Sequence, residues 1–499
     1  MSAAPIAIVG GGLAGMAAAE WITRHSPGTP VVIFESKRRL GGRAGSFRDA
    51  TGEVDYCQHV AMGCCSNFVD LMRQCSLLSH FRRLQELTFL HPDHPPSRFA
   101  ANRWLPAPLH LLSTIDGLRF LSSSQRSEVK RGLLVLMRTP SESLQNTVAD
   151  QWLRQTGQSD RTIAEFWDVI LVSALGELSS RVTMAAARKV LIDGFAATRG
   201  ASDVLVPTLP LADLFGRRLA DQLRRRGVTI RQGCRVRHIN PDRSLLVQSN
   251  EDDEQRIEPS AVICAVPWFG LRRLFQHWDA EDRTPLPHLE RIDSFPSSPI
   301  TGVHLWFDRP ITTMDQAVLV GTVSQWIFRN PISIGEAAVI GEAEGGGPSS
   351  GGDQVGDGHG AAIESDCQHY YQVIVSASAG ALVEGKQSLL HTVLDELKQF
   401  FPAAESARLV RSRLVTDPES VFSIQPEVES ERPGAMTGLN WLYLAGDWVQ
   451  TGWPSTMEGA VISGRQAASA CMRHTGLEHL EPIPLRPPPG LLARCLIRR

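Results

Sequence analysis

The stretch that decides the fold reads Ile6-Ala7-Ile8-Val9-Gly10-Gly11-Gly12-Leu13-Ala14-Gly15. Its four leading apolar residues predict a short buried strand that stops at the glycines, and residues 13–25 carry Ala and Met at helical spacing. A second apolar run, 31–34, follows the turn signals Pro27-Gly28 and Pro30 and ends on Glu35. The first 35 residues therefore predict one strand–helix–strand unit.

The glycines of this stretch have the G-x-G-x-x-G spacing of dinucleotide-binding turns, and an acid, Glu35, stands twenty residues after the last of them. The first glycine permits the tight turn, the second lets the backbone approach a pyrophosphate at the positive end of the helix, and the third allows close packing of helix on strand. Glu35 can accept hydrogen bonds from ribose hydroxyls. The turn residues assigned to the dinucleotide are Gly10, Gly12, Leu13, Ala14 and Gly15.

Two further motifs distinguish FAD from a nicotinamide dinucleotide. Gly41-Gly42-Arg43 follows Glu35, and a fork-shaped guanidinium there can hold pyrophosphate oxygens. Near the other end, an apolar run ends in Gly446-Asp447, where the carboxylate can bond the ribitol. A helix predicted from Met457 would direct its positive end at the flavin pyrimidine. The sequence thus predicts a non-covalently bound FAD, with Gly42 and Gly446 beside it.

Composition limits the remaining classes of protein. The 499 residues, 42% hydrophobic and 21% charged, predict a globular chain of two domains. A formal net charge of -3 without long blocks of like charge argues against nucleic acid as a partner. Nine cysteines without a C-x-x-C pair predict reduced thiols in the cytoplasm. We expect no signal peptide, and no apolar run approaches the roughly 18 to 20 residues of a membrane span.

With these motifs the chain resembles the superfamily of FAD-dependent amine oxidoreductases and phytoene desaturases. The marks of that superfamily are G-x-G-x-x-G, E-x(5)-G-G-R and a late A-G-D followed by E-G-A, and all three are present here. The resemblance places Lys37 where a cation often follows the ribose acid, and Val236 where a valine backbone contacts adenine. It implies an α/β fold class, with a Rossmann-like FAD-binding domain and a mixed α+β substrate domain, as in amine oxidoreductases and glutathione-reductase-type flavoproteins.

The predicted domains are discontinuous. The substrate domain contains a mostly helical insertion from about residue 76 and an alternating stretch from about residue 290 that predicts an antiparallel sheet. The FAD-binding domain is assigned to 1–75, 201–285 and 432–475, and the substrate domain to 76–200 and 286–431.

Two segments of low complexity complete this division. Residues 343–364 are glycine-rich and predict a disordered surface loop. Residues 476–499 form a Pro-rich tail that ends in apolar residues mixed with arginines. This tail is interpreted either as a frayed terminus or as a short anchor at a membrane surface, with the arginines facing anionic headgroups.

Within the superfamily the sequence most resembles the hydroxysqualene dehydroxylases of the hopanoid pathway. This resemblance implies an isoprenoid substrate, reductive dehydroxylation of hydroxysqualene to squalene with reduced flavin, handover from squalene-synthase-like enzymes, and a cytoplasmic protein with peripheral contact at the inner face of the membrane. The matching segments are Asp55–Cys64, Ala174–Glu177, Val206–Leu211 and His304–Pro310.

The first candidate for donating a proton to the departing hydroxyl is His59, and the second is Asp308. Both lie in matching segments, and the pKa of both residue types can be tuned toward neutral pH. Two alternatives stay open. His59 could instead bond the cofactor or the backbone, and Asp308 could lie in a surface turn, paired with Arg309. No metal site is expected, because prolines prevent the helix that would align His91 with His94.

Three other functions share many of these motifs. A carotenoid-type desaturase would move hydride from an isoprenoid to oxidised flavin, and motifs do not decide that direction. An amine oxidase is less well supported, because many such relatives place a lysine beside the flavin in the strand that corresponds to 299–307, which contains none. A prenyl-binding module like the GDP-dissociation inhibitors would not be expected to keep Arg43, Asp447 and Met457-Glu458-Gly459.

Overall fold

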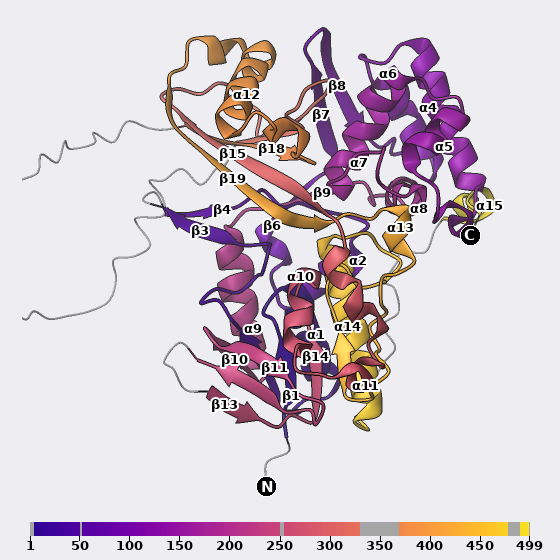
Figure 1. The fold of residues 1–499 in the computed structure, drawn as a ribbon. Coiled ribbons are helices and arrows are strands. Elements are labelled where there is room, and N and C mark those ends of the chain that lie inside the picture. The colour runs from indigo at the N-terminus through magenta and orange to yellow at the C-terminus, as the bar shows by residue number, and fades with distance from the viewer. Residues whose placement is uncertain (1–3, 50–51, 250–253, 330–368, 478–489, 499) are drawn as a thin grey trace, which may run out of the picture.

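The computed structural model describes residues 4–49, 52–249, 254–329, 369–477 and 490–498. A five-stranded parallel sheet forms the lower half of the molecule in Figure 1, with strand order β10-β2-β1-β14-β20. A seven-stranded sheet and a group of short helices beside it form the upper half. The predicted α/β fold is confirmed.

The strands of the parallel sheet come from three distant parts of the chain. Most of their residues are buried, as expected for parallel strands that are covered on both faces. Their bounds are β1 (Ile6–Val9), β2 (Val31–Glu35), β10 (Val228–Gln232), β14 (Ala261–Cys264) and β20 (Leu442–Leu444). Each was expected as a strand, so these predictions are confirmed.

Two long helices pack together against this sheet, α1 (Leu13–His25) and α14 (Met457–His474). Their axes approach closely at Gly464, where an added Cβ would lie 2.1 Å from the carbonyl oxygen of Ala14. The predicted opening unit and the predicted late helix are thus confirmed, and they contact each other directly. Helices α2 (Ser66–Gln74) and α9 (Ala220–Arg225) and the antiparallel strands β11 (Arg235–Ile239), β12 (Leu245–Gln248) and β13 (Glu254–Ile257) complete this half.

The seven-stranded sheet has the order β19-β15-β18-β17-β16-β7-β8. One face packs on α12 (Lys386–Phe400) through alternate residues such as Val303 and Leu305. The other face presents His304 and Trp306 toward the hairpin of β3 (Ser46–Asp49) and β4 (Gly52–Asp55). The antiparallel sheet expected after residue 290 is therefore confirmed. Its strands are β7 (Glu86–His91), β8 (His94–Ala100), β15 (Ser297–Phe307), β16 (Gln316–Leu319), β17 (Trp326–Arg329), β18 (His369–Ser376) and β19 (Leu409–Phe422).

The expectation of mostly helical structure from residue 76 is wrong for residues 81–100. They form β6 (Phe81–Leu84), β7 and β8, because β7 pairs with β8 in a hairpin on one side and, on the other, with β16 through Phe89 and Val318, far away in sequence. β8 is the edge strand of the sheet, and Pro95 and Pro96 fall where its register with β7 shifts, between the pairs His91–His94 and Phe89–Ser97. Helices begin only afterwards, with α3 (Leu112–Gly117), α4 (Ser123–Arg138), α5 (Ala149–Gln155), α6 (Asp160–Thr162), α7 (Asp168–Leu175) and α8 (Met184–Arg188).

Short elements complete the fold. Strand β9 (Val204–Pro207) lies in the segment 201–285, which the sequence assigns to FAD binding, yet it pairs with β5 (Ala61–Met62) and β6. The others are β3 (Ser46–Asp49), β4 (Gly52–Asp55), α10 (Trp268–Leu271), α11 (Ala280–Arg283) and α13 (Pro426–Glu429).

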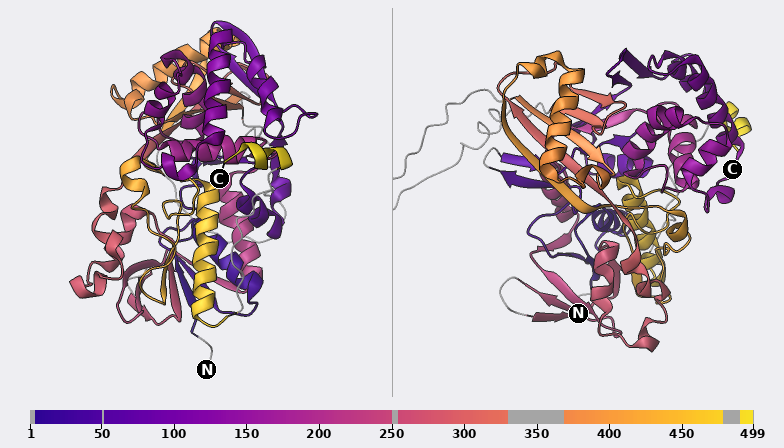
Figure 2. Two further views of the ribbon diagram at one scale, coloured as in Figure 1. Left: turned by 90° about the vertical axis from the view of Figure 1, so that its right-hand side faces the viewer. Right: turned by 45° about the horizontal axis from the view of Figure 1, so that its top comes forward.

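The end of the C-terminal tail packs on the helical region. α15 (Leu491–Leu496) buries Ala493, and the Arg498 N–H donates to the carbonyl of Met137 at 2.8 Å. Figure 2 shows this helix lying against the helical region, above the long α14. For residues 490–498 the interpretation as a frayed terminus is wrong. The predicted loop 343–364 lies outside the described residues.

Candidate functional site

The glycine turn after β1 has the geometry that a dinucleotide needs. Gly10 has φ +115°, and a Cβ there would lie 2.5 Å from the carbonyl oxygen of Ala265. A Cβ at Gly15 would lie 2.1 Å from the carbonyl oxygen of Gly10, so the helix can pack this closely only with glycine. Around Gly12, in contrast, the Gly42 Cα at 3.9 Å is the one atom of the described residues, apart from its chain neighbours, within 4 Å of such a Cβ, so the backbone is open to a ligand.

The start of α1 is free to receive an anion. Its N-cap is Gly12, which has no side chain to cap the helix, and its first turn contains no acidic residue. The N–H groups of Leu13 and Ala14 at this positive end fit a pyrophosphate. At the end of β2, the two carboxylate oxygens of Glu35 accept from the N–H groups of Gly11 and Lys37, both at 2.8 Å. The glycine turn, the open start of α1 and the carboxylate of Glu35 together fit the adenosine and pyrophosphate parts of FAD.

Val236 and Lys37 lie beside Glu35. The N–H of Cys234 donates to the Glu35 carbonyl at 2.9 Å and that of Gly233 to the Lys37 carbonyl at 3.0 Å, which fixes β11 against the end of β2. Val236 is buried there, whereas the Lys37 side chain is exposed. The structure thus brings Val236 to the predicted adenine end of the site and leaves Lys37 on its rim.

Arg43 and Asp447 meet although 404 residues separate them. The Arg43 guanidinium donates to the Asp447 carboxylate and to the Ser420 carbonyl, and it lies 5.3 Å from the centre of the Trp268 ring. The other oxygen of Asp447 accepts from the Ser455 hydroxyl. A cation and a carboxylate are thereby placed together between the glycine turn, the large sheet and the loop that precedes α14.

Sequence reasoning missed Arg432, which holds that loop in place. Its guanidinium is buried and donates to the carbonyls of Trp448 at 3.0 Å and Val449 at 2.8 Å, and to two others of the same loop. Glu429 balances its charge at 3.0 Å. Because all four acceptors in the loop are backbone carbonyls, no side-chain motif in the sequence indicates this contact.

Helix α14 begins at Met457, as predicted, and its N-cap Thr456 accepts from the Gly459 N–H. The next residue, Glu458, is fully buried and accepts from the N–H groups of Asn67 at 3.0 Å and Phe68 at 2.7 Å, at the start of α2. Burial raises the pKa of Glu458 even though these bonds oppose the shift. The start of α14 is therefore fixed against α2.

His59 is placed on the cofactor side but is poorly suited to donate a proton. Its Nδ1 donates to the Cys57 carbonyl at 2.8 Å, which leaves Nε2 as an acceptor. Burial, followed by the charge of Arg43, lowers the pKa of the imidazole, although the bond to Cys57 opposes this. His59 is consequently neutral at pH 7, and its geometry favours accepting or relaying a proton.

Asp308 is not brought near the other predicted residues. It lies beyond the end of β15, about 20 Å along the strand from Gly302, which contacts Tyr56. Its carboxylate pairs with Arg309 at 3.3 Å and accepts from the Arg408 N–H at 2.9 Å, and the latter bond lowers its pKa. The alternative interpretation, a surface turn with an ion pair, describes this geometry, so the structure gives no support to Asp308 as an acid.

A buried polar cluster lies on the face of the large sheet that is turned toward residues 55–59. The Tyr370 hydroxyl and the His304 Nδ1 are 2.8 Å apart, and the Gln372 amide lies 3.2 Å from the same nitrogen. The same amide donates to the Asp55 carbonyl at 3.2 Å. Sequence reasoning identified only the His304 segment here, because Tyr370 and Gln372 stand in a strand with no recognisable motif.

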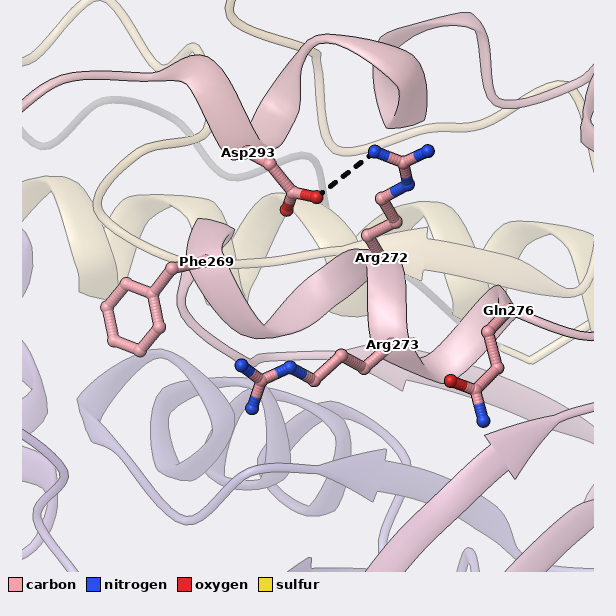
Figure 3. A pocket seen from close by; sticks show the side chains of 5 residues that line it. All are labelled: Phe269, Arg272, Arg273, Gln276 and Asp293. Atoms are coloured by element: carbon pink, nitrogen blue, oxygen red, sulfur yellow. Dashed lines mark hydrogen bonds and ion pairs between the residues drawn. The ribbon is translucent and has the colours of Figure 1, made fainter.

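A surface pocket of about 350 Å³ opens beside α10 (Figure 3). Arg272 extends toward Asp293 at 3.3 Å, and Arg273 extends toward Phe269. None of the predicted site residues lines this pocket, and its polar side chains are mostly exposed.

Among the residues that the structure describes, no group of three or more His, Cys, Asp or Glu is placed to hold a metal ion. Nor does any helix of the described part have the length and apolar character to cross a membrane.

Comparison with known proteins gives the chain a family. The model of the flavin containing amine oxidoreductases matches residues 13–472. The 15-cis-phytoene desaturase of Synechococcus elongatus is 22% identical over 93% of this chain and 95% of its own length. The zeta-carotene desaturase of Synechocystis sp. is 23% identical over 94% of this chain and 97% of its own length.

Solved structures share the fold. An oxidoreductase from Methanosarcina mazei has a TM-score of 0.65 at 14% identity and covers 92% of this chain and 98% of its own. The cyclohexylamine oxidase of Brevibacterium oxydans has a TM-score of 0.62 at 15% identity, covering 95% and 100%. The glycine turn, the Arg43–Asp447 pair and the helix at Met457 fit the cofactor of this family. The chain therefore belongs to the flavin containing amine oxidoreductases, and it is an FAD-dependent oxidoreductase.

Proposed function

We propose that this enzyme transfers hydride between FAD and a long acyclic isoprenoid. The observation that carries the proposal is the match over more than nine-tenths of the chain to desaturases of phytoene and zeta-carotene. A second observation supports a hydrocarbon over an amine: β15, the strand in which many amine-oxidising relatives carry a lysine beside the flavin, contains none.

FAD, when bound, accepts or supplies the hydride, and the protein holds and orients it. Glu35 would bind the ribose and Val236 the adenine, with Lys37 at the rim. The start of α1 and Arg43 would bind the pyrophosphate, and Asp447 the ribitol, while α14 would direct its positive end at the ring. The proposed contacts are Gly10, Gly12, Leu13, Ala14, Gly15, Glu35, Lys37, Gly42, Arg43, Val236, Gly446, Asp447 and Met457.

Two reactions fit this arrangement. Desaturation, in which the isoprenoid loses hydride and a proton, is the reaction that the names of the relatives favour. Reductive dehydroxylation of hydroxysqualene, in which the carbon gains hydride and the hydroxyl leaves as water with one added proton, is favoured by the four matching segments. In desaturation a hydride and a proton both leave the isoprenoid, whereas in dehydroxylation a hydride and a proton are both delivered to it.

A two-armed assay decides between them. Oxidised holoenzyme is incubated with phytoene, and photoreduced holoenzyme is incubated without oxygen with hydroxysqualene, while flavin absorbance and extracted products are followed. Bleaching of the flavin with a new conjugated product supports desaturation, and return of the yellow colour with squalene supports dehydroxylation. If neither substrate changes the flavin and a primary amine does, the isoprenoid proposal is wrong.

The isoprenoid substrate implies exchange with a lipid phase or a partner enzyme. We propose peripheral contact with the inner face of the membrane from the cytoplasm, and handover from squalene-synthase-like enzymes. Trp104 and Leu491, each about 80% exposed, are apolar side chains available for such contact. Flotation of the purified protein with anionic vesicles tests the membrane part, because a protein that stays at the bottom of the gradient contradicts it.

A further inference from the structure

The loop that follows β8 has a tip that exposes apolar side chains. Its residues 101–106 read Ala-Asn-Arg-Trp-Leu-Pro. Trp104 is 79% exposed and Leu105 is 36% exposed. Of the eleven tryptophans in the chain, nine are buried and Trp326 is half-buried, which leaves Trp104 as the exposed one. Burying such a ring is among the largest apolar gains available to a protein, so its exposure points to a binding role.

Hydrogen bonds hold this tip in one shape. The Asn102 side chain accepts from the N–H groups of Trp104 at 2.8 Å and Leu105 at 3.3 Å. At the base of the loop, the Asn102 N–H donates to the His110 carbonyl at 2.8 Å, and the His110 N–H donates to the Pro106 carbonyl at 3.1 Å. The exposure of Trp104 is therefore built into the loop.

Arg199 binds the carbonyl groups of the tip. Its guanidinium donates to the carbonyls of Leu105 at 2.8 Å, Asn102 at 3.3 Å and Arg103. A backbone group that enters the apolar part of a bilayer needs a partner from its own protein, because lipid tails offer none. A protein partner could supply such donors itself. The satisfied backbone of the tip therefore favours lipid as the surface that it contacts.

The charges at the tip are positive. Residues 101–111 contain one arginine and no acid. The Arg103 guanidinium lies over the Trp104 ring, 4.9 Å from its centre. Among the described residues, Arg103 contacts this ring and Arg199 contacts carbonyls, so neither charge is paired with a carboxylate. Cations beside an apolar aromatic ring are suited to a surface of anionic headgroups above acyl chains.

The tip stands on a segment that packs against the cofactor loop. Ala201 follows two residues after Arg199, and its carbonyl accepts from the Cys64 N–H at 2.9 Å. Ala201 and Cys64 share an apolar cluster with Trp453, which belongs to the loop that precedes α14. A surface bound at the tip is thereby connected through a few printed contacts to the region proposed for the flavin.

We propose that the tip 101–106 is the element by which this protein docks on a bilayer that contains anionic lipids. Trp104 and Leu105 enter the upper acyl region, and Arg103 and Arg199 face the phosphates. The proposal rests on the proposed function, because an isoprenoid substrate resides in that phase. The tail 490–498 is not required, since its contacts are made within the protein.

Vesicle binding by variants tests this assignment. Holoprotein is mixed with vesicles of phosphatidylcholine and phosphatidylglycerol, and the bound fraction is measured by flotation. Trp104→Ala should lower the partition by about 10-fold or more, because the ring supplies most of the apolar area at the tip. Arg103→Ala should lower it about 5-fold on these vesicles and leave it unchanged on phosphatidylcholine alone. Val383→Ala removes another apolar side chain, 82% exposed, and should bind like wild type.

Quenching by brominated lipids locates the ring independently of affinity. Wild type bound to such vesicles should lose part of its tryptophan emission. Trp104→Phe keeps an aromatic ring at the tip but should show no such loss, because none of the other ten tryptophans is exposed.

Equal flotation of wild type and Trp104→Ala, or equal quenching of wild type and Trp104→Phe, overturns the proposal. So does a wild type that ignores the vesicles and forms a dimer in sedimentation that Trp104→Ala abolishes, because the tip then binds a second copy of the chain. None of these readouts uses a substrate. A wild type that docks through Trp104 and converts no isoprenoid overturns only the substrate class.

Discussion

At the residue scale, the pair between Arg43 and Asp447 concentrates the chemistry of the cofactor site. Asp447 accepts from two donors, Arg43 and Ser455, while Arg432 fixes the backbone around it. Each of these bonds involves an ionised group, and such bonds contribute about 1.5–3 kcal/mol each. The position of Arg43 therefore depends on one carboxylate from the far end of the chain.

Asp447→Ala should weaken FAD binding by about 10- to 100-fold, the equivalent of one or two charge-assisted hydrogen bonds. Titration of apoprotein with FAD, followed by flavin fluorescence, measures the change. Asp308→Ala is the matched control, because it removes a carboxylate from a surface ion pair and should leave both FAD affinity and turnover unchanged. A large loss of turnover in the control would restore Asp308 as a candidate acid.

Asp55→Asn should change how stability depends on pH. The pKa of Asp55 is raised from 3.8 to about 6 in the folded protein. Its contribution to the stability of the fold is therefore fully present below pH 3.8 and is lost as pH rises to about 6. The Asn variant cannot ionise and keeps the Oδ1 acceptor. Its Tm relative to wild type should therefore rise between pH 4 and 6 and stay constant above pH 6, as measured by thermal melts.

Asp213→Asn should change the pH dependence of stability in the opposite direction and serves as the comparison. The pKa of Asp213 is lowered, chiefly by bonds to Arg218 and Arg217 that outweigh its desolvation. Its contribution is present above the unfolded pKa, so this variant should lose stability relative to wild type as pH rises from 3 to 5. Parallel behaviour of the two variants would contradict the assigned shifts.

At the element scale, α1 and α14 form the support of the cofactor site, and their contact depends on Gly464. Alanine is normally better than glycine inside a helix by about 1 kcal/mol. Here its Cβ would lie 2.1 Å from the Ala14 carbonyl oxygen, which must push the helices apart. Backbone atoms on both sides leave no flexible side chain to yield.

Gly464→Ala should therefore lower the free energy of unfolding by about 1–3 kcal/mol and reduce the FAD content of the purified protein. Chemical denaturation and the ratio of flavin to protein absorbance measure the two effects. Gly270→Ala, in α10, is the control, because nothing lies within 4 Å of its Cβ. Equal stability of the two variants would show that the helices can separate without cost.

Local signals explain which elements the sequence could predict. β1, α1 and β2 follow from an apolar run, a glycine turn and helical spacing within 35 residues. β7 was missed because its pairing with β16, more than 200 residues later, leaves no local pattern, and because the hairpin that it forms with β8 contains Pro95 and Pro96. The same holds for the site: Arg43 and Asp447 belong to motifs, whereas Arg432 acts on carbonyls and Asp55 acquires its raised pKa from burial.

At the scale of the whole molecule, the described end of the tail ties the C-terminus to the helical region. Arg188 donates to the carbonyls of Thr139 and Arg498, and Arg498 in turn donates to Met137. The tail thus bridges the end of α4 and the start of the π-helical segment Lys189–Ala196. A membrane anchor at this position would have to leave those contacts or use only its exposed face.

Deletion of residues 490–499 should lower Tm by a few degrees, because it removes these hydrogen bonds and uncovers part of the hydrophobic cluster against which Ile497 packs. Differential scanning fluorimetry of the full-length and shortened proteins measures the shift. Flotation with anionic vesicles is run on the same two proteins. Unchanged Tm together with lost flotation would show that the tail serves as an anchor and contributes nothing to folding.

The separation of 404 residues between Arg43 and Asp447 also has a consequence during synthesis. A ribosome adds about 5–20 residues per second, so Arg43 leaves the exit tunnel roughly 20 to 80 s before its partner exists. Throughout that interval the parallel sheet lacks β20 and α1 lacks α14. The nascent chain must keep this apolar surface from aggregating, and the cofactor can be captured only after almost the entire protein has been translated.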